Sequence, residues 1–338
     1  MKVLILGCGS IGLRHIGHLR QLGLSNLEAA DPSPSAQQRV KAQWGIPVDS
    51  DPEKALSRRP DLVLVCTPAA THVDLTIKAL EAGAHVFVEK PLSVSLEKVR
   101  PLIERKNVDG RMVQVGYNLR YHPAMKAAKQ VLDSGRMGRV LAGHAEFGLY
   151  LKKWWPGRDY RDSYMASAEE GGGLLLDVSH EIDLMIWFLG PVREVSAYGD
   201  RLSNLEMEGL DVIKVLMKME SGALVSLSMD CLQPAYMRGF TLTGEDSALR
   251  WGCPEGRADT SVGELSLCES PSERFQPVAV SGSSQETYLE ELRDFISSIE
   301  TGRPPACGLR EAAEVLRVVE AIHRAIEQKR SVQVSECR

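Results

Sequence analysis

Residues 3–12, VLILGCGSIG, join a run of four apolar residues to a glycine-rich turn and to the start of a helical pattern. A short strand that is apolar throughout is typical of a parallel sheet covered on both faces. Gly7, Gly9 and Gly12 have the G-x-G-x-x-G spacing, which allows a tight turn and close packing of a helix on the strand. These residues therefore predict the first strand, turn and helix of a βαβ unit.

The first 120 residues repeat this alternation of short apolar runs and amphipathic stretches. The expected strands are 3–6, 27–30, 62–66, 86–88 and 112–115, and the expected helices are 11–22, 36–44, 73–82 and 96–104. Repeated βαβ units predict an α/β domain with a doubly wound parallel sheet. We therefore expect a Rossmann domain of the dinucleotide-binding type over residues 1–121.

The hydrophobic pattern changes its period after NLRYHPAM at 118–125. We expect a helix at 123–134 and then strands in which apolar and polar residues alternate. The expected strands are 140–147, 194–199, 211–220, 224–231, 240–244 and 264–268, and helices at 285–300 and 309–329 follow. Residues 122–338 are therefore expected to form an α+β domain with a mostly antiparallel sheet.

The composition narrows the class of protein. The chain has 338 residues, a formal net charge of −5 and 43% hydrophobic residues. This favours a soluble globular protein without an electrostatic attraction to nucleic acid or to an anionic membrane. Seven dispersed cysteines without a C-x-x-C pair argue against a disulfide framework and a zinc site. The first apolar run ends in the glycine turn, so we expect no signal peptide and a cytoplasmic protein.

The glycine turn predicts a site for a dinucleotide, whose phosphates would lie over the helix N-terminus. The residues expected to hold them are Gly7, Gly9, Ser10, Ile11 and Gly12. Asp31 ends the second expected strand, 19 residues after Gly12. A carboxylate there accepts hydrogen bonds from a ribose diol and repels a 2′-phosphate, so we expect NAD in preference to NADP. Arg39 keeps NADP open, and a glycine turn in another kind of α/β protein is the alternative.

Two further segments, CTPAATH at 66–72 and EKP at 89–91, end expected strands at the same edge of the sheet, where ligands bind. The residues that they place beside the cofactor are Thr67, Pro68, His72, Glu89 and Lys90. Desolvation lowers the pKa of a lysine and suits it to proton transfer. Pro91 would fix the turn, in a trans or a cis form. A surface lysine and a helix-end histidine without a ligand are the alternatives.

Two later segments carry polar and titratable side chains. GYNLRYHP at 116–123 supplies Asn118, Arg120 and Tyr121, which suit a polyhydroxylated ligand or a polar contact between domains. In GGGLLLDVSHEID at 171–183, one helix would carry Asp177, His180 and Asp183 at spacings of three, roughly on one face. A carboxylate that orients an imidazole is a recurring acid–base device. A helix cap with a core histidine is the alternative.

These motifs, in this order, resemble those of the Gfo/Idh/MocA oxidoreductase family, which includes glucose–fructose oxidoreductase and inositol dehydrogenase. The matching segments are 7–12, 66–72, 89–91, 116–123 and 171–183, and they span about half of the chain. The resemblance implies a C-terminal domain with an open-faced sheet. It also implies a homo-dimer or homo-tetramer that assembles through that sheet.

The resemblance also implies the catalytic residues. In the family, the lysine of EKP acts with an aspartate and a histidine of the GGG segment at the carbon that exchanges hydride with nicotinamide. Carried over, Lys90 would contact the reacting oxygen, His180 would be the main acid–base group, and Asp177 would orient His180 or bind a substrate hydroxyl. Many members place the histidine four residues after the aspartate, whereas His180 follows Asp177 by three. A shift of one residue turns a helical side chain by about 100°, so Asp183 or Glu181 is a further candidate for part of its role.

The segment LKKWWPGRDYRDSYMAS at 151–167 resembles the substrate loop of family members that act on sugars. Aromatic rings stack on sugar faces, and arginine pairs with a phosphate or a carboxylate. The substrate contacts expected from this loop are Trp155, Arg158, Tyr160 and Tyr164. A contact between subunits is the alternative.

The expected function is that of an NAD(P)-dependent dehydrogenase acting on a secondary alcohol or ketone of a sugar, cyclitol or sugar derivative. Two other functions stay open at this point. One is a redox-assisted glycosidase or lyase that retains its NAD, and the other is a catalytically silent NAD-dependent sensor. Lys90, Asp177 and His180 argue against the sensor, because a binding protein needs no acid–base set. No metal, nucleic acid or membrane partner is expected.

Overall fold

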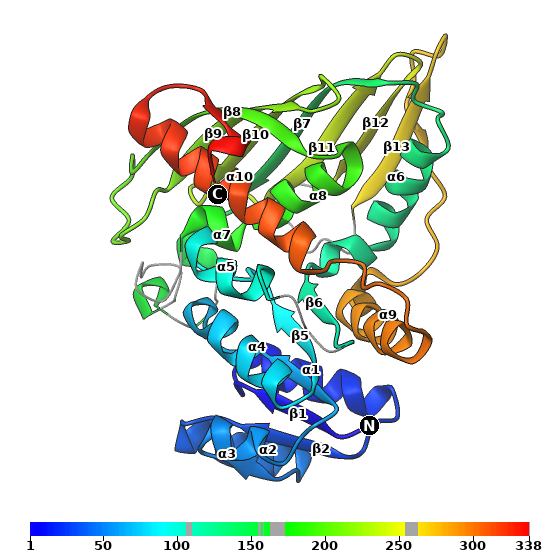
Figure 1. Cartoon of the computed structure of the whole chain (residues 1–338). Coiled ribbons are helices and arrows are strands. Elements are labelled where there is room, and N and C mark those ends of the chain that lie inside the picture. The colour runs from blue at the N-terminus through cyan, green and yellow to red at the C-terminus, as the bar shows by residue number, and fades with distance from the viewer. Residues whose placement is uncertain (106–109, 155–156, 158, 163–172, 254–262, 338) are drawn as a thin grey trace. The chain divides into compact units, whose positions relative to one another are not determined.

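The structure is a computed structural model that describes residues 1–105, 110–154, 157, 159–162, 173–253 and 263–337. The chain divides into two compact units (Figure 1). The first unit contains Met1–Asn118 and Glu286–Ala313, and the second contains Leu119–Gln285 and Glu314–Arg338. Each unit is built on a sheet of its own.

The first unit contains a six-stranded sheet in which every pair of neighbouring strands is parallel. Its strands run in the order β3-β2-β1-β4-β5-β6, which is the order of a dinucleotide-binding fold. They are β1 (Val3–Leu6), β2 (Leu27–Ala30), β3 (Val48–Asp49), β4 (Leu62–Val65), β5 (His85–Glu89) and β6 (Val113–Gly116). All residues of β1, β4 and β6 are buried, as strands covered on both faces require. The predicted Rossmann fold is confirmed.

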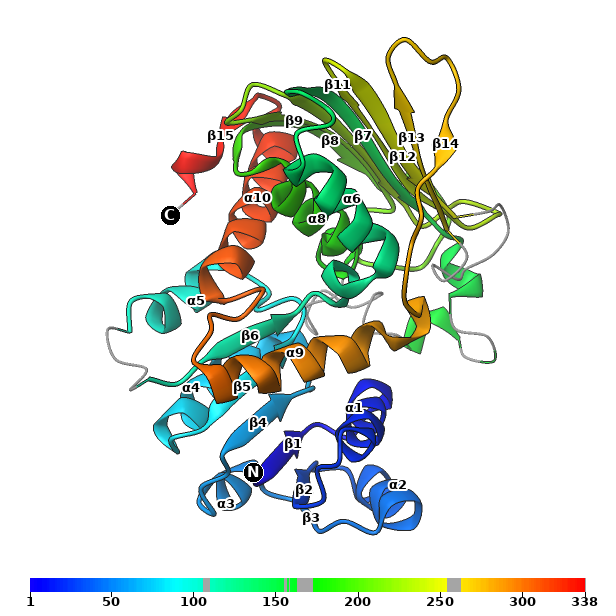
Figure 2. The ribbon, with the colours of Figure 1, turned by 90° about the vertical axis from the view of Figure 1, so that its right-hand side faces the viewer.

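Helices pack on both faces of this sheet. They are α1 (Ser10–Gln21), α2 (Pro34–Trp44), α3 (Pro52–Leu56), α4 (His72–Glu81), α5 (Leu96–Ile103) and α9 (Thr287–Thr301). Ile16 of α1, Val40 of α2 and Phe295 of α9 belong to one apolar core together with Phe87 of β5. α9 lies against α1 although nearly the whole second unit separates the two in sequence (Figure 2).

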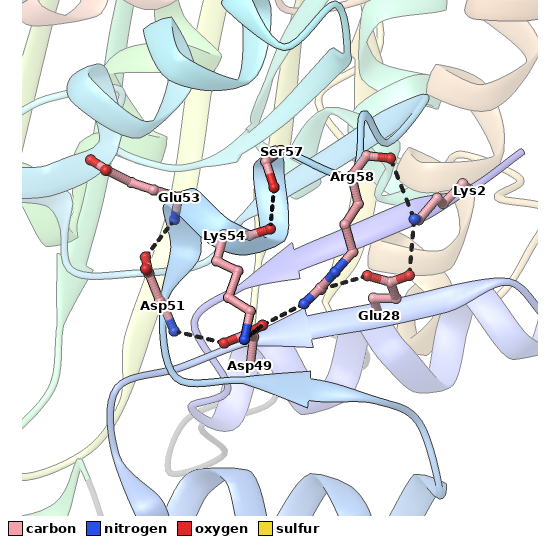
Figure 3. A network of polar contacts seen from close by, with 8 residues as sticks. All are labelled: Lys2, Glu28, Asp49, Asp51, Glu53, Lys54, Ser57 and Arg58. Carbon is pink, nitrogen blue, oxygen red and sulfur yellow. Dashed lines mark hydrogen bonds and ion pairs between the residues drawn. The ribbon is translucent and has the colours of Figure 1, made fainter.

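The two-residue edge strand β3 has no clear hydrophobic pattern, and a network of ion pairs holds it (Figure 3). Arg58, just after α3, pairs with Glu28 of β2 at 2.9 Å and also with Asp49 of β3. Lys2 approaches Glu28 to 3.0 Å. The network therefore ties β2, β3 and the start of β1 together at this edge.

We expect Arg58→Ala to lower the urea midpoint of unfolding at neutral pH, because Arg58 neutralises two carboxylates. Burial alone would raise the pKa of Glu28, but the hydrogen bonds from Lys2 and Arg58 outweigh it and lower that pKa. A lowered folded-state pKa means that the stabilisation is present above the unfolded pKa and is lost as pH falls through the folded one. The difference from wild type should therefore shrink as pH falls through the lowered folded-state pKa of Glu28, and also in high salt. An equal difference under all conditions would contradict ion pairing as its cause.

The second unit contains a nine-stranded sheet in the order β14-β13-β12-β11-β7-β10-β9-β8-β15. Its strands are β7 (Val140–Gly148), β8 (Val192–Asp200), β9 (Val212–Met219), β10 (Leu224–Asp230), β11 (Met237–Gly244), β12 (Ser247–Gly252), β13 (Glu264–Glu269), β14 (Gln276–Pro277) and β15 (Val332–Gln333). β7 and β10 pair in parallel, and all other neighbours in this sheet are antiparallel. The predicted mostly antiparallel sheet is confirmed.

One face of this sheet is packed and the other is exposed. Helices α6 (Pro123–Asp133), α8 (Ser179–Leu189) and α10 (Leu309–Gln328, of which the part from Glu314 belongs here) lie on one side (Figure 2). On that side, the ring of Phe188 lies 5.4 Å from the ring of Phe240. On the other face, Tyr198 is 83% and Leu216 is 48% exposed. Within the part of the chain that the structure describes, no helix is long and apolar enough to cross a membrane.

The segment after the GGG run differs from its prediction. The sequence pattern predicts one helix that carries Asp177, His180 and Asp183, but the structure has two. α7 (Leu174–Asp177) ends at Asp177, and α8 begins at Ser179. Val178, between them, has φ −94° and ψ 20°, and valine and serine are both weak helix formers. Asp177 therefore closes one helix and His180 lies in the first turn of the next, so a single helical spacing does not relate them.

Candidate functional site

The carboxyl edge of the six-stranded sheet begins with the glycine turn after β1. Gly7 has φ +90°, and a Cβ there would lie 2.6 Å from the carbonyl oxygen of Cys66. A Cβ on Gly12 would lie 2.0 Å from the carbonyl oxygen of Gly7. Both positions require glycine because backbone atoms approach them closely. Gly9 is different, since nothing lies within 4 Å of a Cβ built there.

The space at Gly9 adjoins the N-terminus of α1. Gly9 is the N-cap residue of this helix and provides no side-chain hydrogen bond to it. The first backbone N–H groups of a helix have no partner within the helix. Ser10, Ile11 and Gly12 supply such groups, and helix N-termini of this kind bind phosphate. The turn therefore fits the phosphates of a dinucleotide.

Asp31 follows β2 at the same edge, and hydrogen bonds fix its carboxylate. Oδ2 accepts from the backbone N–H of Cys8 at 2.7 Å, and Oδ1 accepts from the backbone N–H of Ser33 at 2.8 Å. Burial and the neighbouring charge of Asp31 raise the pKa of the Cys8 thiol to about 12. The carboxylate is thus held directly beside the glycine turn, and Cys8 stays protonated at neutral pH.

The loop after β4 places Thr67 and Pro68 before α4, where His72 is the first residue. His72 is 1% exposed, with Nδ1 2.8 Å from the carbonyl oxygen of Pro91 and Nε2 2.8 Å from that of Thr67. Burial lowers the pKa of His72, although the two carbonyl contacts act in the opposite direction. His72 therefore joins this loop to the EKP turn from a buried position.

The EKP turn ends β5. Glu89 is buried, and its Oε1 lies 2.6 Å from Nε2 of His15 in α1. Its Oε2 accepts a hydrogen bond from the backbone N–H of Lys90 at 3.3 Å. Lys90 is half-buried, and the Lys90–Pro91 peptide bond is cis. Four strand ends thus bring the glycine turn, Asp31, Thr67 and Lys90 to one edge of one sheet.

In the second unit, two ion pairs, one buried and one partly buried, hold α8. Arg120 donates to both carboxylate oxygens of Asp183, at 2.9 and 2.6 Å. Arg238 of β11 donates to Glu181 at 2.6 Å. Burial alone would lower the pKa of Arg238, but the Glu181 carboxylate raises it. Glu181 and Asp183, the two acidic residues that follow His180 in α8, are therefore each paired with an arginine.

The other residues expected to contact a substrate are held in different ways. Asn118, in the first unit, donates to the Oγ1 of Thr287 at 2.9 Å. Tyr121 is buried, and Tyr160 is buried with its hydroxyl accepting from the backbone N–H of Glu206 at 3.0 Å. Trp155, Arg158 and Tyr164 lie outside the described residues. Lys90 belongs to the first unit, and Asp177 and His180 belong to the second.

Two partners in these contacts have no signal in the sequence. His15 stands in a helical pattern like any core histidine, 74 residues before Glu89. Arg238 lies 57 residues after Glu181, in an ordinary strand pattern. Pairs of this kind can be predicted only when the order of the strands in the sheet is known, and a single sequence does not reveal that order.

Comparison with known proteins gives matches over both units. A family model described as the GFO_IDH_MocA oxidoreductase family, with an NAD-binding Rossmann fold, matches residues 1–117, and a model of the GFO/IDH/MocA C-terminal domain matches residues 125–250. Myo-inositol 2-dehydrogenase of Thermotoga maritima is 28% identical over 99% of each chain. The scyllo-inositol 2-dehydrogenase (NAD(+)) of Bacillus subtilis is 31% identical over 66% of this chain and 65% of its own. Levoglucosan dehydrogenase, solved with NADH, has the same fold, with a TM-score of 0.87 at 19% identity over 99% of both chains.

Proposed function

Because the chain belongs to the Gfo/Idh/MocA oxidoreductase family and contains its NAD-binding Rossmann domain, we propose that it is an NAD-dependent dehydrogenase of a secondary alcohol in a cyclitol or sugar derivative. The observation that carries the proposal is the open space at Gly9, beside the N-terminus of α1 and on the same sheet edge as Lys90. Similarity over 99% of both chains to a protein named myo-inositol 2-dehydrogenase supports the substrate class.

NAD is the proposed cofactor in preference to NADP. The fixed carboxylate of Asp31 suits a ribose diol and would repel a 2′-phosphate. The printed name of the Bacillus subtilis relative, which specifies NAD(+), agrees with this choice. The residues proposed to contact the cofactor are Gly7, Gly9, Ser10, Ile11, Gly12, Asp31, Thr67, Pro68 and Lys90, with buried His72 supporting the loop.

The nicotinamide, when bound, accepts a hydride from the carbon that carries the hydroxyl group. Lys90 is proposed to take the hydroxyl proton at Nζ. His180, oriented by Asp177, is proposed as a second acid–base group. Since Arg120 and Asp183 neutralise each other, they are proposed to fix α8 rather than to offer a charge to the substrate.

The remaining assignments concern the domains. Residues 1–121 are proposed to bind the cofactor and, at the end of this range, to add two substrate contacts, and residues 122–338 to supply the other substrate contacts and the contact between subunits. Asn118, Tyr121 and Tyr160 are the proposed substrate contacts among the described residues, and Trp155, Arg158 and Tyr164 complete the proposed set. The exposed sheet face that carries Tyr198 and Leu216 is the proposed surface for a homo-dimer or homo-tetramer.

The test is a substrate screen with the purified full-length chain. Myo-inositol, scyllo-inositol and a panel of sugars and sugar acids are each incubated with NAD or NADP, and absorbance of the reduced cofactor is followed. We expect net NADH formation with at least one polyol, and a kcat/KM for NAD above that for NADP by about tenfold or more. Substrate turnover without net NADH would contradict the dehydrogenase, and a higher kcat/KM with NADP would contradict the role of Asp31.

A further inference from the structure

Within the first unit, the carboxylate of Glu89 contacts His15, which belongs to a different element of secondary structure. His15 of α1 is fully buried, and its Nε2 lies 2.6 Å from Oε1 of Glu89 at the end of β5. The helix that begins at the glycine turn is thereby joined to the strand that ends at Lys90. The contacts given for the pair lie within the protein, between His15, Glu89 and the backbone of Lys90.

The surroundings of His15 indicate which proton its ring carries. Its ring centroid lies 5.3 Å from that of Phe87 and 6.0 Å from that of Tyr288, both at steep angles. Nδ1 has no hydrogen-bond partner among the described residues. A charged imidazolium would bury a second N–H without an acceptor, which is unfavourable. The neutral ring with its proton on Nε2, donated to Glu89, matches these contacts.

The carboxylate of Glu89 links His15 to the backbone of Lys90, because each of its two oxygens contacts one of them. An ionised carboxylate only accepts hydrogen bonds, and the two oxygens of Glu89 face two donors, Nε2 of His15 and the backbone N–H of Lys90. Gly116 of β6 leaves room for the side chain, since a Cβ there would lie 3.2 Å from Oε2 of Glu89. The carboxylate is therefore enclosed by α1, β6 and the turn.

A second histidine holds the same turn one residue later. Nδ1 of His72 lies 2.8 Å from the carbonyl oxygen of Pro91. The turn is thus held at the N–H of Lys90 through Glu89 and His15, and at the carbonyl of Pro91 through His72. These two contacts leave the Lys90 backbone little freedom, while its side chain is only half-buried.

We propose that His15 and Glu89 are positioning residues that fix the backbone at Lys90 and so aim its Nζ. This rests on the proposed function, in which Lys90 takes the substrate proton. Proton transfer needs a donor and an acceptor at hydrogen-bond distance, and a misplacement of about 1 Å costs about 10²-fold in rate. Because both carboxylate oxygens of Glu89 are engaged within the protein, we expect this support to act on kcat rather than on binding.

The experiment uses His15→Phe, which keeps a ring against Phe87 and Tyr288 but removes the donor to Glu89. We expect kcat to fall by about 10- to 100-fold, with KM and the Kd for NAD within about threefold of wild type. His18→Phe is the matched control, because His18 lies on the same helix and stacks on Tyr288 without contacting Glu89. It should keep the wild-type kcat.

Glu89 gives a graded series. Glu89→Gln keeps a carbonyl oxygen that can accept from His15, so its kcat should lie between those of wild type and Glu89→Ala. In the double variant His15→Phe/Glu89→Ala, kcat should equal that of Glu89→Ala alone, because both changes break one connection. Amide hydrogen exchange at Lys90 should be faster in His15→Phe and unchanged in His18→Phe, which is a readout that needs no substrate.

The outcomes separate the two proposals. If Lys90→Ala is inactive but His15→Phe and Glu89→Ala keep the wild-type kcat, the positioning role is overturned and the proposed function stands. If Lys90→Ala is as active as wild type, the proposed catalytic role fails, whatever the exchange at Lys90 shows. If His15→Phe loses NAD binding and thermal stability in proportion to kcat, the pair is merely structural, and the inference fails.

Discussion

Lys90→Ala is expected to lower kcat by about 10²- to 10⁴-fold, the usual contribution of a positioned acid–base group. NAD should still bind with a Kd within about threefold of wild type, because the proposed phosphate contacts lie at the turn after β1 and at the first residues of α1. Steady-state kinetics with the best polyol of the screen measure kcat. Quenching of the protein's fluorescence during titration with NAD measures the Kd separately.

Two variants sharpen this result. Lys90→Arg keeps the positive charge but stays protonated, because arginine does not lose its proton in proteins. It should therefore be nearly as inactive as Lys90→Ala. Lys98→Ala, at an exposed position of α5, is the control for loss of a lysine and should leave kcat unchanged. An active Lys90→Arg enzyme would show that charge, rather than proton transfer, is what this position supplies.

The second large effect is expected from alanine at two neighbouring glycines, with opposite consequences. Gly12→Ala would place a Cβ 2.0 Å from the carbonyl oxygen of Gly7, so α1 must move away from the turn. We expect the free energy of unfolding to fall by about 3 kcal/mol or more, or the chain to fail to fold. Urea unfolding monitored by fluorescence measures this loss.

Gly9→Ala is the matched variant, because its Cβ would meet nothing within 4 Å and its φ is −70°. The chain should fold with a urea midpoint close to that of wild type. The added methyl group would, however, occupy the space proposed for the phosphates, so the Kd for NAD should rise by about tenfold or more. Wild-type NAD affinity in Gly9→Ala would remove the support that this space gives to the cofactor site.

The first sheet was predictable because its signals are local. β1 and β2 begin and end at the residues that their apolar runs predict. Each of these strands is followed directly by a candidate functional residue. Parallel strands share a carboxyl edge, so the order of the motifs along the chain was sufficient to bring Asp31 and Lys90 to one edge. The two-residue strand β3 (Val48–Asp49) had no such run, and ion pairs rather than hydrophobic period hold it.

What the sequence did not contain is which surface an amphipathic helix covers. The pattern at 285–300 predicts a helix, but the same apolar stripe would suit either sheet. The break at Val178 could not be predicted either. A short helix followed by a longer one has the same apolar composition as one continuous helix. The ion pair of Arg120 with Asp183 and the contact of His15 with Glu89 depend on such tertiary choices, so the supports of the site became visible only in the structure.

The place of α9 has a consequence for how the chain is made. Leu292 and Phe295 fill the same core as Ile16 and Phe87, so a fragment that ends near residue 121 would present this apolar surface to water. Domains at the N-terminus usually fold first as a chain leaves the ribosome. Here the first unit stays incomplete until more than 290 residues have been synthesised. The unit that begins the chain is therefore among the last parts to close.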